Sequence, residues 1–333
     1  MHSWYLKRYP IIVSVPTAYT ATVTPPGGTI YQYIDVTFTV STDVPTPNYT
    51  WSVASGGSVI SGQGTTSAVI RFTGTGSRTV TCDVTGGGAA SDSDTVTVTA
   101  FTPALISNLA GWWDASSLSY VTVDGSNKVS QVNDRSGNSR NMTQGNGLLQ
   151  PTWSSSVRNG LGAVLLDNAD DFIQTSVIAP TNWIGSGQNV TVLAFCSLGP
   201  GRFGLQLNTS RTGSTSAIQS DNVLTGGWRH LNSSGSQTVQ IAPESGAYTL
   251  DILRWTSGQK VAVKRKVSGT ATDYESASTV THTYVSNLGA FIGSGTGNNQ
   301  TGYQCESMVF SRRLTDAEVR QLTDYIEGKW GTI

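Results

Sequence analysis

Three aspartates in a short run are the most suggestive group of chemically capable residues in this chain. Asp167, Asp170 and Asp171 lie close together in the segment LLDNADDF. Calcium binds six to eight oxygen atoms, and carboxylates that follow one another on a loop can supply several of them. The spacing differs from that of an EF-hand loop, and aspartate is also common in turns, where its side chain bonds nearby backbone. The run predicts a calcium site, with a plain turn as the alternative, and no other cofactor is expected.

The remaining reactive side chains form no catalytic pattern. Glycoside hydrolysis uses two carboxyl groups that flank the scissile bond, and Glu306, in a strand-like run, has no acidic residue close by in sequence. Serine hydrolysis needs a nucleophile beside a histidine base, but no G-x-S-x-G motif is present and the histidines have no acidic neighbour that favours a triad: His2, His230 and His282. We therefore expect a protein that is not an enzyme, with a glycan-degrading enzyme kept as a second alternative.

Two groups of aromatic residues could make contacts with other molecules. Sugar rings stack on exposed aromatic faces, and four candidates lie in or near loop-like segments, with burial in a core as the alternative for each: Trp183, Trp228, Tyr284 and Tyr303. Residues 1–15 are also rich in large side chains, among them Trp4, Tyr5, Leu6 and Tyr9. Termini are often disordered unless something holds them. We interpret this segment as an arm that docks on a partner or as the first strand of the next domain.

The composition excludes several functional classes. Charged residues make up 12% of the 333 residues and the net charge is −1, so no basic surface for nucleic acid is expected. No apolar run approaches the roughly 20 residues of a membrane-spanning helix, and the first residues do not match a signal peptide. The cysteines lie far apart in apolar runs and predict buried thiols, with a Cys196–Cys305 disulfide as the alternative: Cys82, Cys196 and Cys305.

The chain pattern indicates two β-rich regions. Within residues 16–100, apolar and polar residues alternate in short runs between Gly, Pro, Ser and Asn turns, which is typical of a β-sandwich. Residues 101–104 include Pro103 and form the expected linker. Residues 105–333 hold further strand-like runs. One of them carries a basic cluster that is typical of a solvated edge strand: Lys260, Lys264, Arg265 and Lys266.

One helix is strongly indicated near residue 320. Thr315 and Glu318 have the spacing of a capping box, in which each side chain bonds a backbone N–H that the helix leaves free. The apolar residues that follow recur at three- and four-residue intervals and form one face: Val319, Leu322, Ile326 and Trp330. Gly331 ends the run. Because the rest of the chain is rich in strands, this apolar face must be buried on a sheet.

Both regions resemble known families. The stretches GWWDASSLSYVTVDGSNKVSQVNDRSGNSRNMTQ, NGLGAVLLDNADDFIQT and SRRLTDAEVRQLTDYIEGKWG are similar to parts of concanavalin A-like (laminin-G-like) jelly-roll domains in bacteriophage and bacterial surface proteins. The stretch YTWSVASGGSVISGQGTTSAVIRFTGTGSRTVTCDVT resembles bacterial immunoglobulin-like or PKD-like domains, in which Trp51 would be the core tryptophan and Cys82 would take the place of a second cysteine. The expected fold class is all-β, an immunoglobulin-like β-sandwich followed by a concanavalin A-like jelly roll with one C-terminal helix. Laminin-G-like domains often hold calcium at a rim, which raises the expectation for the aspartate run.

The resemblance also implies a function. It favours a non-enzymatic structural protein of a bacteriophage virion that decorates the capsid or tail surface and acts in adhesion. The expected partners are other virion proteins and further copies of the same chain, and the expected location is the virion surface. A lectin-like module that binds host glycans is the alternative. Because a shared fold supports a function only by association, the residues of the site must decide between the two.

Overall fold

The computed structural model describes residues 18–167, 169–198, 205–208, 217–221, 227–232, 235–240, 246–277, 279, 287–293 and 301–333. Only the backbone is described for residues 198, 217–221, 227–232 and 235–240, apart from Val239. The chain divides into a small unit, Met1–Phe101, and a large unit, Thr102–Ile333, and this boundary lies inside the stretch predicted to be a linker. None of the helices among the described residues is long and apolar enough to cross a membrane.

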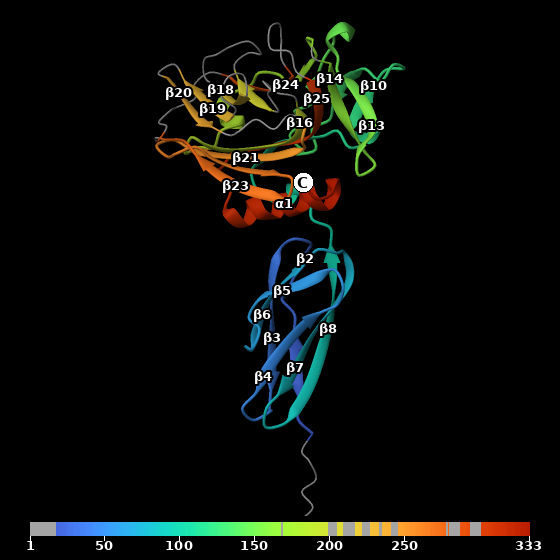
Figure 1. Ribbon diagram of the computed structural model, residues 1–333, viewed down its shortest axis with the longest axis vertical. Helices are drawn as coiled ribbons and strands as arrows, with labels where there is room; N and C mark the ends of the chain where they lie inside the picture. The colour runs from blue at the N-terminus through green and yellow to red at the C-terminus, as the bar shows by residue number, and fades with distance from the viewer. Residues whose placement is uncertain are drawn as a thin grey trace, which may run out of the picture. The chain divides into compact units, whose positions relative to one another are not determined.

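The small unit is a sandwich of two four-stranded sheets (Figure 1). One sheet has the order β1 (Ala21–Thr24), β3 (Asp35–Thr42), β6 (Ser67–Phe72) and β5 (Gly57–Ser61). The other has the order β2 (Ile30–Tyr31), β8 (Ala89–Thr99), β7 (Gly76–Thr85) and β4 (Asn48–Val53). Trp51 pairs with Cys82 across β4 and β7, and both side chains are buried. The predicted sandwich is confirmed, while the immunoglobulin-like family assignment stays a prediction.

The large unit is built on two larger sheets that face each other. The nine-stranded sheet has the order β10 (Val121–Val123), β11 (Val129–Val132), β12 (Met142–Thr143), β15 (Phe172–Gln174), β24 (Gly289–Gly293), β17 (Gln206–Asn208), β18 (Ala217–Asp221), β19 (Gly227–Asn232) and β20 (Gly235–Gln240). The eight-stranded sheet has the order β13 (Thr152–Arg158), β14 (Leu161–Asp167), β25 (Thr301–Phe310), β16 (Asn189–Leu198), β21 (Thr249–Thr256), β22 (Ala262–Val267) and β23 (Thr270–Glu275), and β9 (Leu109–Asp114) also pairs with β25.

Four short 3-10 turns and one α-helix complete the described elements: η1 (Pro103–Leu105), η2 (Leu118–Tyr120), η3 (Gly147–Leu149), η4 (Pro180–Asn182) and α1 (Asp316–Trp330). Strands dominate the rest of the described chain, so the predicted all-β class with a single C-terminal helix is confirmed. All three cysteines are buried free thiols, as predicted.

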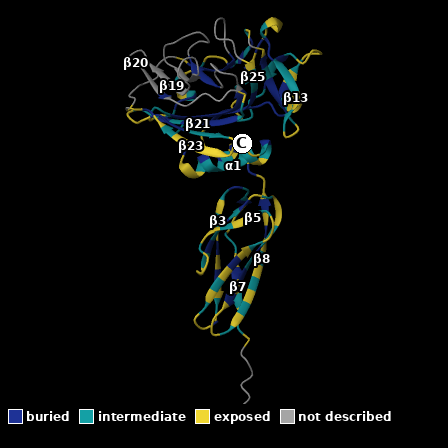
Figure 2. Ribbon diagram, in the orientation of Figure 1, coloured by how far each residue is buried: buried dark blue, intermediate teal, exposed yellow. Residues whose placement is uncertain are grey.

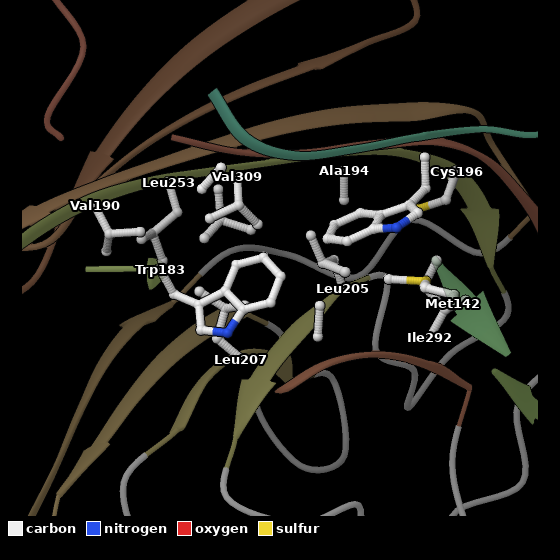
Figure 3. Packing of buried hydrophobic residues seen from close by; sticks show 14 of the residues in the cluster. Met142, Trp183, Val190, Ala194, Cys196, Leu205, Leu207, Leu253, Ile292 and Val309 are labelled. Carbon is white, nitrogen blue, oxygen red and sulfur yellow. The ribbon is translucent and has the colours of Figure 1, made fainter. Parts of the chain in front are cut away.

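The apolar runs of the central strands are explained by two buried faces. Along β16, Val190, Val192 and Ala194 point into the space between the two sheets, where they join the main core of the large unit (Figure 3). The residues between them are buried on the opposite face, where the Phe195 ring lies 5.5 Å from the Trp330 ring of α1. Figure 2 shows β21 as a nearly continuous buried strand for the same reason. A strand covered on both faces carries apolar residues without alternation.

Helix α1 begins and ends where the sequence predicts. Thr315 Oγ1 accepts a hydrogen bond from the Glu318 backbone N–H, and the Glu318 carboxylate accepts one from the Thr315 N–H, so the capping box is confirmed. Arg312 binds the Glu318 carboxylate and, with the capping bonds, lowers the pKa of Glu318 to about 2. The four apolar residues of the predicted face are all buried. Gly331 is the C-cap, with a φ of 84° that favours glycine.

Removing the capping hydroxyl tests how much this helix start contributes. Thr315→Ala leaves the Glu318 N–H without its partner, and we expect the free energy of unfolding to fall by about 1 kcal/mol. Thr323→Ala is the matched control, because Thr323 lies inside α1 and its hydroxyl donates to the Val319 carbonyl, an interaction that does not favour helices. Urea unfolding followed by circular dichroism compares the two variants. An equal loss in both would contradict the capping argument.

One prediction about the sheet is wrong. The lysine-rich run that was expected to be an edge strand is β22, which lies between β21 and β23. The edge strand is β23, with the sequence TATDYE. Most of its residues are polar and exposed, so no pattern of apolar residues in the sequence marks it as a strand. The lysines of β22 instead form ion pairs across the face of the sheet, for example Lys264 with Asp273 at 2.9 Å.

Candidate functional site

The three aspartates lie where the chain crosses from one sheet of the large unit to the other. β14 of the eight-stranded sheet ends at Asp167, and β15 of the nine-stranded sheet begins at Phe172. Two further strand ends lie beside this crossing, because Asp167 pairs with Thr301 at the start of β25 and Phe172 pairs with Gly293 at the end of β24. Four strand ends therefore meet at one rim of the sandwich and bring the aspartates together. We call Asp167, Asp170 and Asp171 the rim cluster.

The rim cluster converges closely enough to hold one cation. One carboxylate oxygen from each aspartate lies within 4.8 Å of the others. Asp167 is exposed, Asp170 is half-buried and Asp171 is buried, with 4% of its surface exposed. Asp171 Oδ2 accepts a hydrogen bond of 3.1 Å from the Asp167 backbone N–H. Its Oδ1 is buried and has no hydrogen-bond partner in the described part of the chain. A buried carboxylate oxygen without a partner is unfavourable unless a cation or a proton neutralises it.

The electrostatics of the rim cluster agree with this geometry. Burial and the charges of the neighbouring Asp167 and Asp170 together raise the pKa of Asp171 to about 6, against the opposing effect of Lys128. The backbone of β24 also lies close to the rim cluster. A Cβ on Gly293 would lie 2.4 Å from the Asp171 carbonyl oxygen, so only glycine fits at this position. Hard oxygen donors on a loop are the ligands that calcium prefers. The residues of the rim cluster therefore fit a calcium ion.

A polar groove of about 520 Å³ lies on the same unit, and we call it the amide groove. Its lining consists mainly of amide and hydroxyl groups, including those of Gln131, Asn141 and Thr143. These residues come from β11, β12, the loop that follows β15 and the segment 138–141. The Asn141 Oδ1 accepts a bond of 2.9 Å from the Asp134 N–H, and the Gln131 Nε2 donates one of 2.7 Å to Asn133. These bonds hold the amides in place. Asn141 Nδ2 and Gln131 Oε1 remain without partners among the described residues and are available to a ligand.

The amide groove has one charged residue in its lining, Arg140. The guanidinium donates to the Ala110 and Asn182 carbonyl oxygens at 2.6 and 2.8 Å and lies 4.7 Å from the Trp183 ring. Burial lowers the pKa of Arg140, and the charge of Asp134 opposes this effect. Because its donors already serve the backbone, Arg140 orders the wall of the groove. The groove therefore offers mainly neutral donors and acceptors.

A second pair of acids lies beneath helix α1. Glu306 on β25 pairs in register with Asp114 on β9, and both side chains are fully buried. Lys329 of α1 joins them, with Nζ 2.8 Å from Glu306 Oε2 and 2.7 Å from Asp114 Oδ2. Arg135 forms another ion pair with Asp114, and its guanidinium lies 4.0 Å from the Trp112 ring. We call this group the buried charge cluster.

Glu306 is the centre of the buried charge cluster. Its Oε1 accepts hydrogen bonds from Trp112 Nε1 at 2.7 Å and from the Tyr325 hydroxyl at 3.0 Å. Its Oε2 accepts from Trp330 Nε1 at 2.9 Å and from Lys329. Burial and the neighbouring Asp114 raise the pKa of Glu306, while Lys329 lowers it. Since α1 and the sheet cover both acids, no substrate reaches them, and the cluster joins the helix to the sheet.

The predicted aromatic contacts have different outcomes. Trp183 is fully buried, and its Nε1 donates to the Leu288 carbonyl at 2.9 Å, so it is a core residue without an exposed face for sugar (Figure 3). Tyr303 is half-buried on β25. The side chain of Trp228 and all of Tyr284 lie outside the described residues, as do the predicted docking residues Trp4, Tyr5, Leu6 and Tyr9. Sequence reasoning noted Glu306 but missed Asp114 and the amide groove.

No family model matches the chain, and no curated protein matches its sequence. Similar solved structures include domain 4 of AbnA, a GH43 extracellular arabinanase from Geobacillus stearothermophilus, in complex with arabinotriose, at 14% identity and a TM-score of 0.41, over 65% of this chain and 98% of that one. The binding domain of Paraclostridial Mosquitocidal Protein 1 is similar at 14% identity and a TM-score of 0.47, over 67% and 55% of the chains. A mutant GH54 α-L-arabinofuranosidase soaked with 4-nitrophenyl α-L-arabinofuranoside is similar at 12% identity and a TM-score of 0.42, over 61% of this chain and about half, 51%, of that one. Likeness at this level assigns no function.

Proposed function

We propose that the large unit is a non-catalytic carbohydrate-binding module that depends on calcium held by the rim cluster. The observation that carries the proposal is the buried Oδ1 of Asp171, which has no partner among the described residues and lies where three carboxylates converge. A bound cation would contact this oxygen and would also reduce the repulsion between the carboxylates of Asp167 and Asp170. Oxygen donors alone favour calcium or magnesium, and calcium tolerates the irregular geometry of a loop better than magnesium does.

A bound calcium ion would also explain why the cluster is partly open. Three carboxylates supply between three and six oxygens, whereas calcium takes six to eight. Asp167 is exposed and Asp170 is half-buried, so the remaining positions face solvent and can be filled by water or by ligand hydroxyls. Calcium supplies a Lewis-acidic contact for neighbouring hydroxyl oxygens when bound. The three carboxylates of the rim cluster would hold the ion at the end of the sandwich, where a ligand hydroxyl can reach it.

The amide groove supports a polyhydroxylated ligand. Sugar hydroxyls both donate and accept hydrogen bonds, and amides offer both functions in one planar group. The available Asn141 Nδ2 and Gln131 Oε1 supply one donor and one acceptor at fixed positions. A volume of about 520 Å³ lies within the usual range for small-ligand sites. The groove is therefore suited to a neutral sugar.

Binding is a better account than catalysis for the described residues. Glycoside hydrolysis requires two carboxyl groups on either side of a bound substrate. Glu306 and Asp114 are close enough for this role, but both are fully buried beneath α1. The rim cluster is accessible, but its three carboxylates point toward one another and not across a groove. This supports the proposal that the chain recognises a ligand without transforming it.

A glycan array probed with and without calcium tests the proposal. We expect saturable binding in calcium that chelation with EDTA abolishes, and Asp170→Ala should weaken it at least tenfold by removing one of the three ligands. Asp83→Asn is the control, since it alters an exposed aspartate on β7 of the small unit. Calcium-independent binding, or equal binding by Asp170→Ala, would overturn the calcium-dependent proposal. Release of reducing ends from any bound polysaccharide would overturn the non-catalytic part.

We further propose that such binding serves adhesion at the surface of a virion. This placement is supported by the resemblance of the chain to surface proteins of bacteriophages and stays a prediction. Gold-labelled antibody against the large unit, applied to purified particles, measures it directly. Labelling of the capsid or the tail is the expected result, and unlabelled particles from which the chain is absent by mass spectrometry would contradict it.

A further inference from the structure

A groove of about 600 Å³ lies between helix α1 and the strands β22 and β23 of the large unit. We call it the helix groove. Its lining is mostly charged and includes Arg313 and Arg320 from the helix side and Arg254, Lys264 and Glu275 from the sheet side. A volume of this size is typical of small-ligand sites. The helix groove shares no lining residue with the rim cluster or with the amide groove.

Several charges in the helix groove neutralise one another. Lys264 lies 2.9 Å from Asp273, and Arg254 lies 2.6 Å from Asp316. Lys266 pairs with Glu327. These pairs leave little net charge along most of the groove, so a ligand must be recognised by a group that the pairs do not include.

Arg313 is such a group. It has no carboxylate within ion-pair distance in the described part of the chain, and its one hydrogen bond runs from Nη1 to the Arg254 carbonyl oxygen at 3.2 Å. A guanidinium has five N–H donors in a planar fork, so most of the Arg313 donors have no protein partner there. Half-buried arginine without an acidic partner is unusual, because removing a charge from water is unfavourable unless another charge compensates.

A second arginine, Arg254, also favours a bound anion in the helix groove. Arg254 lines the same groove and its Nε is buried without a hydrogen-bond partner in the described residues. Burial and the charge of Arg254 lower the pKa of Arg313, against the weaker opposing effects of Glu275 and Asp316. Glu275 is engaged with Lys260 at 3.6 Å, and Asp316 with Arg254. Asp316 is the carboxylate that both arginines share, and it is bound to Arg254. A single carboxylate compensates only one of the two positive charges.

We propose that the helix groove is a binding site for the oxyanion group of a small acidic ligand, with Arg313 as the anchoring cation. Carboxylate and sulfate groups match the guanidinium fork, which can donate two parallel hydrogen bonds to them. Arg254 is already paired with Asp316, so Arg313 is the cation that meets the bound group. Ala262 and Tyr274 also line the groove and supply apolar surface for the rest of the ligand. This site goes beyond the proposed calcium-dependent function and does not depend on it.

Calorimetric titration of the whole chain with four probes tests the proposal: sodium acetate, sodium sulfate, glucuronate and its neutral counterpart glucose. Calcium is first removed from the protein with a chelating resin, and the titrations are run in calcium-free buffer at low ionic strength, so that the rim cluster does not contribute. We expect glucuronate to bind and glucose not to bind. Acetate and sulfate binding as tightly as glucuronate would assign the site to the oxyanion alone, while weaker binding would show that the sugar ring contributes; either result supports the site.

Two variants of Arg313 give the decisive comparison. Arg313→Gln is expected to weaken glucuronate binding at least tenfold, and Arg313→Lys, which keeps the charge but loses the fork, should show an intermediate loss. Both should fold normally, because Arg313 makes a single long hydrogen bond. Arg71→Gln, which removes an arginine from the small unit, is the control and should bind as the unaltered chain does. The absence of anion binding at millimolar concentration, or equal binding by Arg313→Gln, would overturn the proposal.

Discussion

Replacing Glu306 with glutamine is expected to lower the free energy of unfolding of the large unit by about 3–5 kcal/mol, the range for a buried ion pair that loses one partner. The carboxylate accepts hydrogen bonds from four groups, including Trp330 Nε1 and Lys329 Nζ. The amide of glutamine keeps one acceptor oxygen but places an NH2 group where a carboxylate oxygen accepted hydrogen bonds from two of these donors. Lys329 and Arg135 then lie beside a single buried carboxylate, that of Asp114. Guanidinium unfolding followed by tryptophan fluorescence measures the loss.

The control is the same chemical change at an exposed position. Glu275→Gln removes a carboxylate that is 59% exposed and pairs with Lys260 at 3.6 Å, so its effect should remain below about 1 kcal/mol. A double variant sharpens the result. Adding Lys329→Met to Glu306→Gln restores the charge balance and should recover part of the loss, since the two residues are directly coupled. Equal effects of Glu306→Gln and Glu275→Gln would contradict a buried charge cluster.

Calcium affinity is expected to fall steeply as the pH falls below about 6. The pKa of Asp171 is raised to about 6 by burial and by the two neighbouring aspartates. Calcium binds the ionised carboxylate, so a proton competes with it, and below this pKa the affinity should drop roughly tenfold per pH unit. Above about pH 7 the affinity should be nearly constant. Titration with calcium between pH 5 and pH 7.5 measures the slope.

The same pKa shift predicts the opposite trend for stability without calcium. The folded protein binds this proton more tightly than the unfolded chain, whose carboxyl has a value near 3.8. Ionised Asp171 therefore destabilises the calcium-free protein above about pH 6, and this cost is relieved as the pH falls from 6 toward 3.8. Asp171→Asn should abolish calcium binding and stabilise the calcium-free protein. A calcium affinity that is independent of pH, or that survives Asp171→Asn, would contradict the assignment.

Local signals in the sequence predicted the local structure well. The capping box of Thr315 and Glu318 placed the start of α1 correctly, because such a box is encoded within four residues. The alternation around Trp51 and Cys82 likewise placed both in the core of the small unit. The aspartates of the rim cluster were recognisable because they are neighbours in the chain. The strand ends that surround them, at Gly293 and Thr301, come from distant parts of the chain and could not be predicted in this way.

Features assembled from distant segments were not predictable in the same way. Glu306 looked isolated, since the pairing of β25 with β9 that brings Asp114 beside it joins opposite ends of the large unit. The tryptophans were ambiguous because the same residue type serves a core and a sugar site, and only the burial of Trp183 decides. The amide groove collects single polar residues from several strands and loops. No periodicity marks such residues, because their role depends on the three-dimensional arrangement.

The pairing of β9 with β25 has a consequence for synthesis on the ribosome. Trp112 and Glu306, which bond each other, are separated by 194 positions, so the large unit cannot complete its central sheet until β25 has emerged. The small unit closes within its own hundred or so residues and can fold much earlier, as separate domains generally do. During the interval the nascent chain exposes apolar strands with open edges. We therefore expect the large unit to depend on chaperones more than the small unit does.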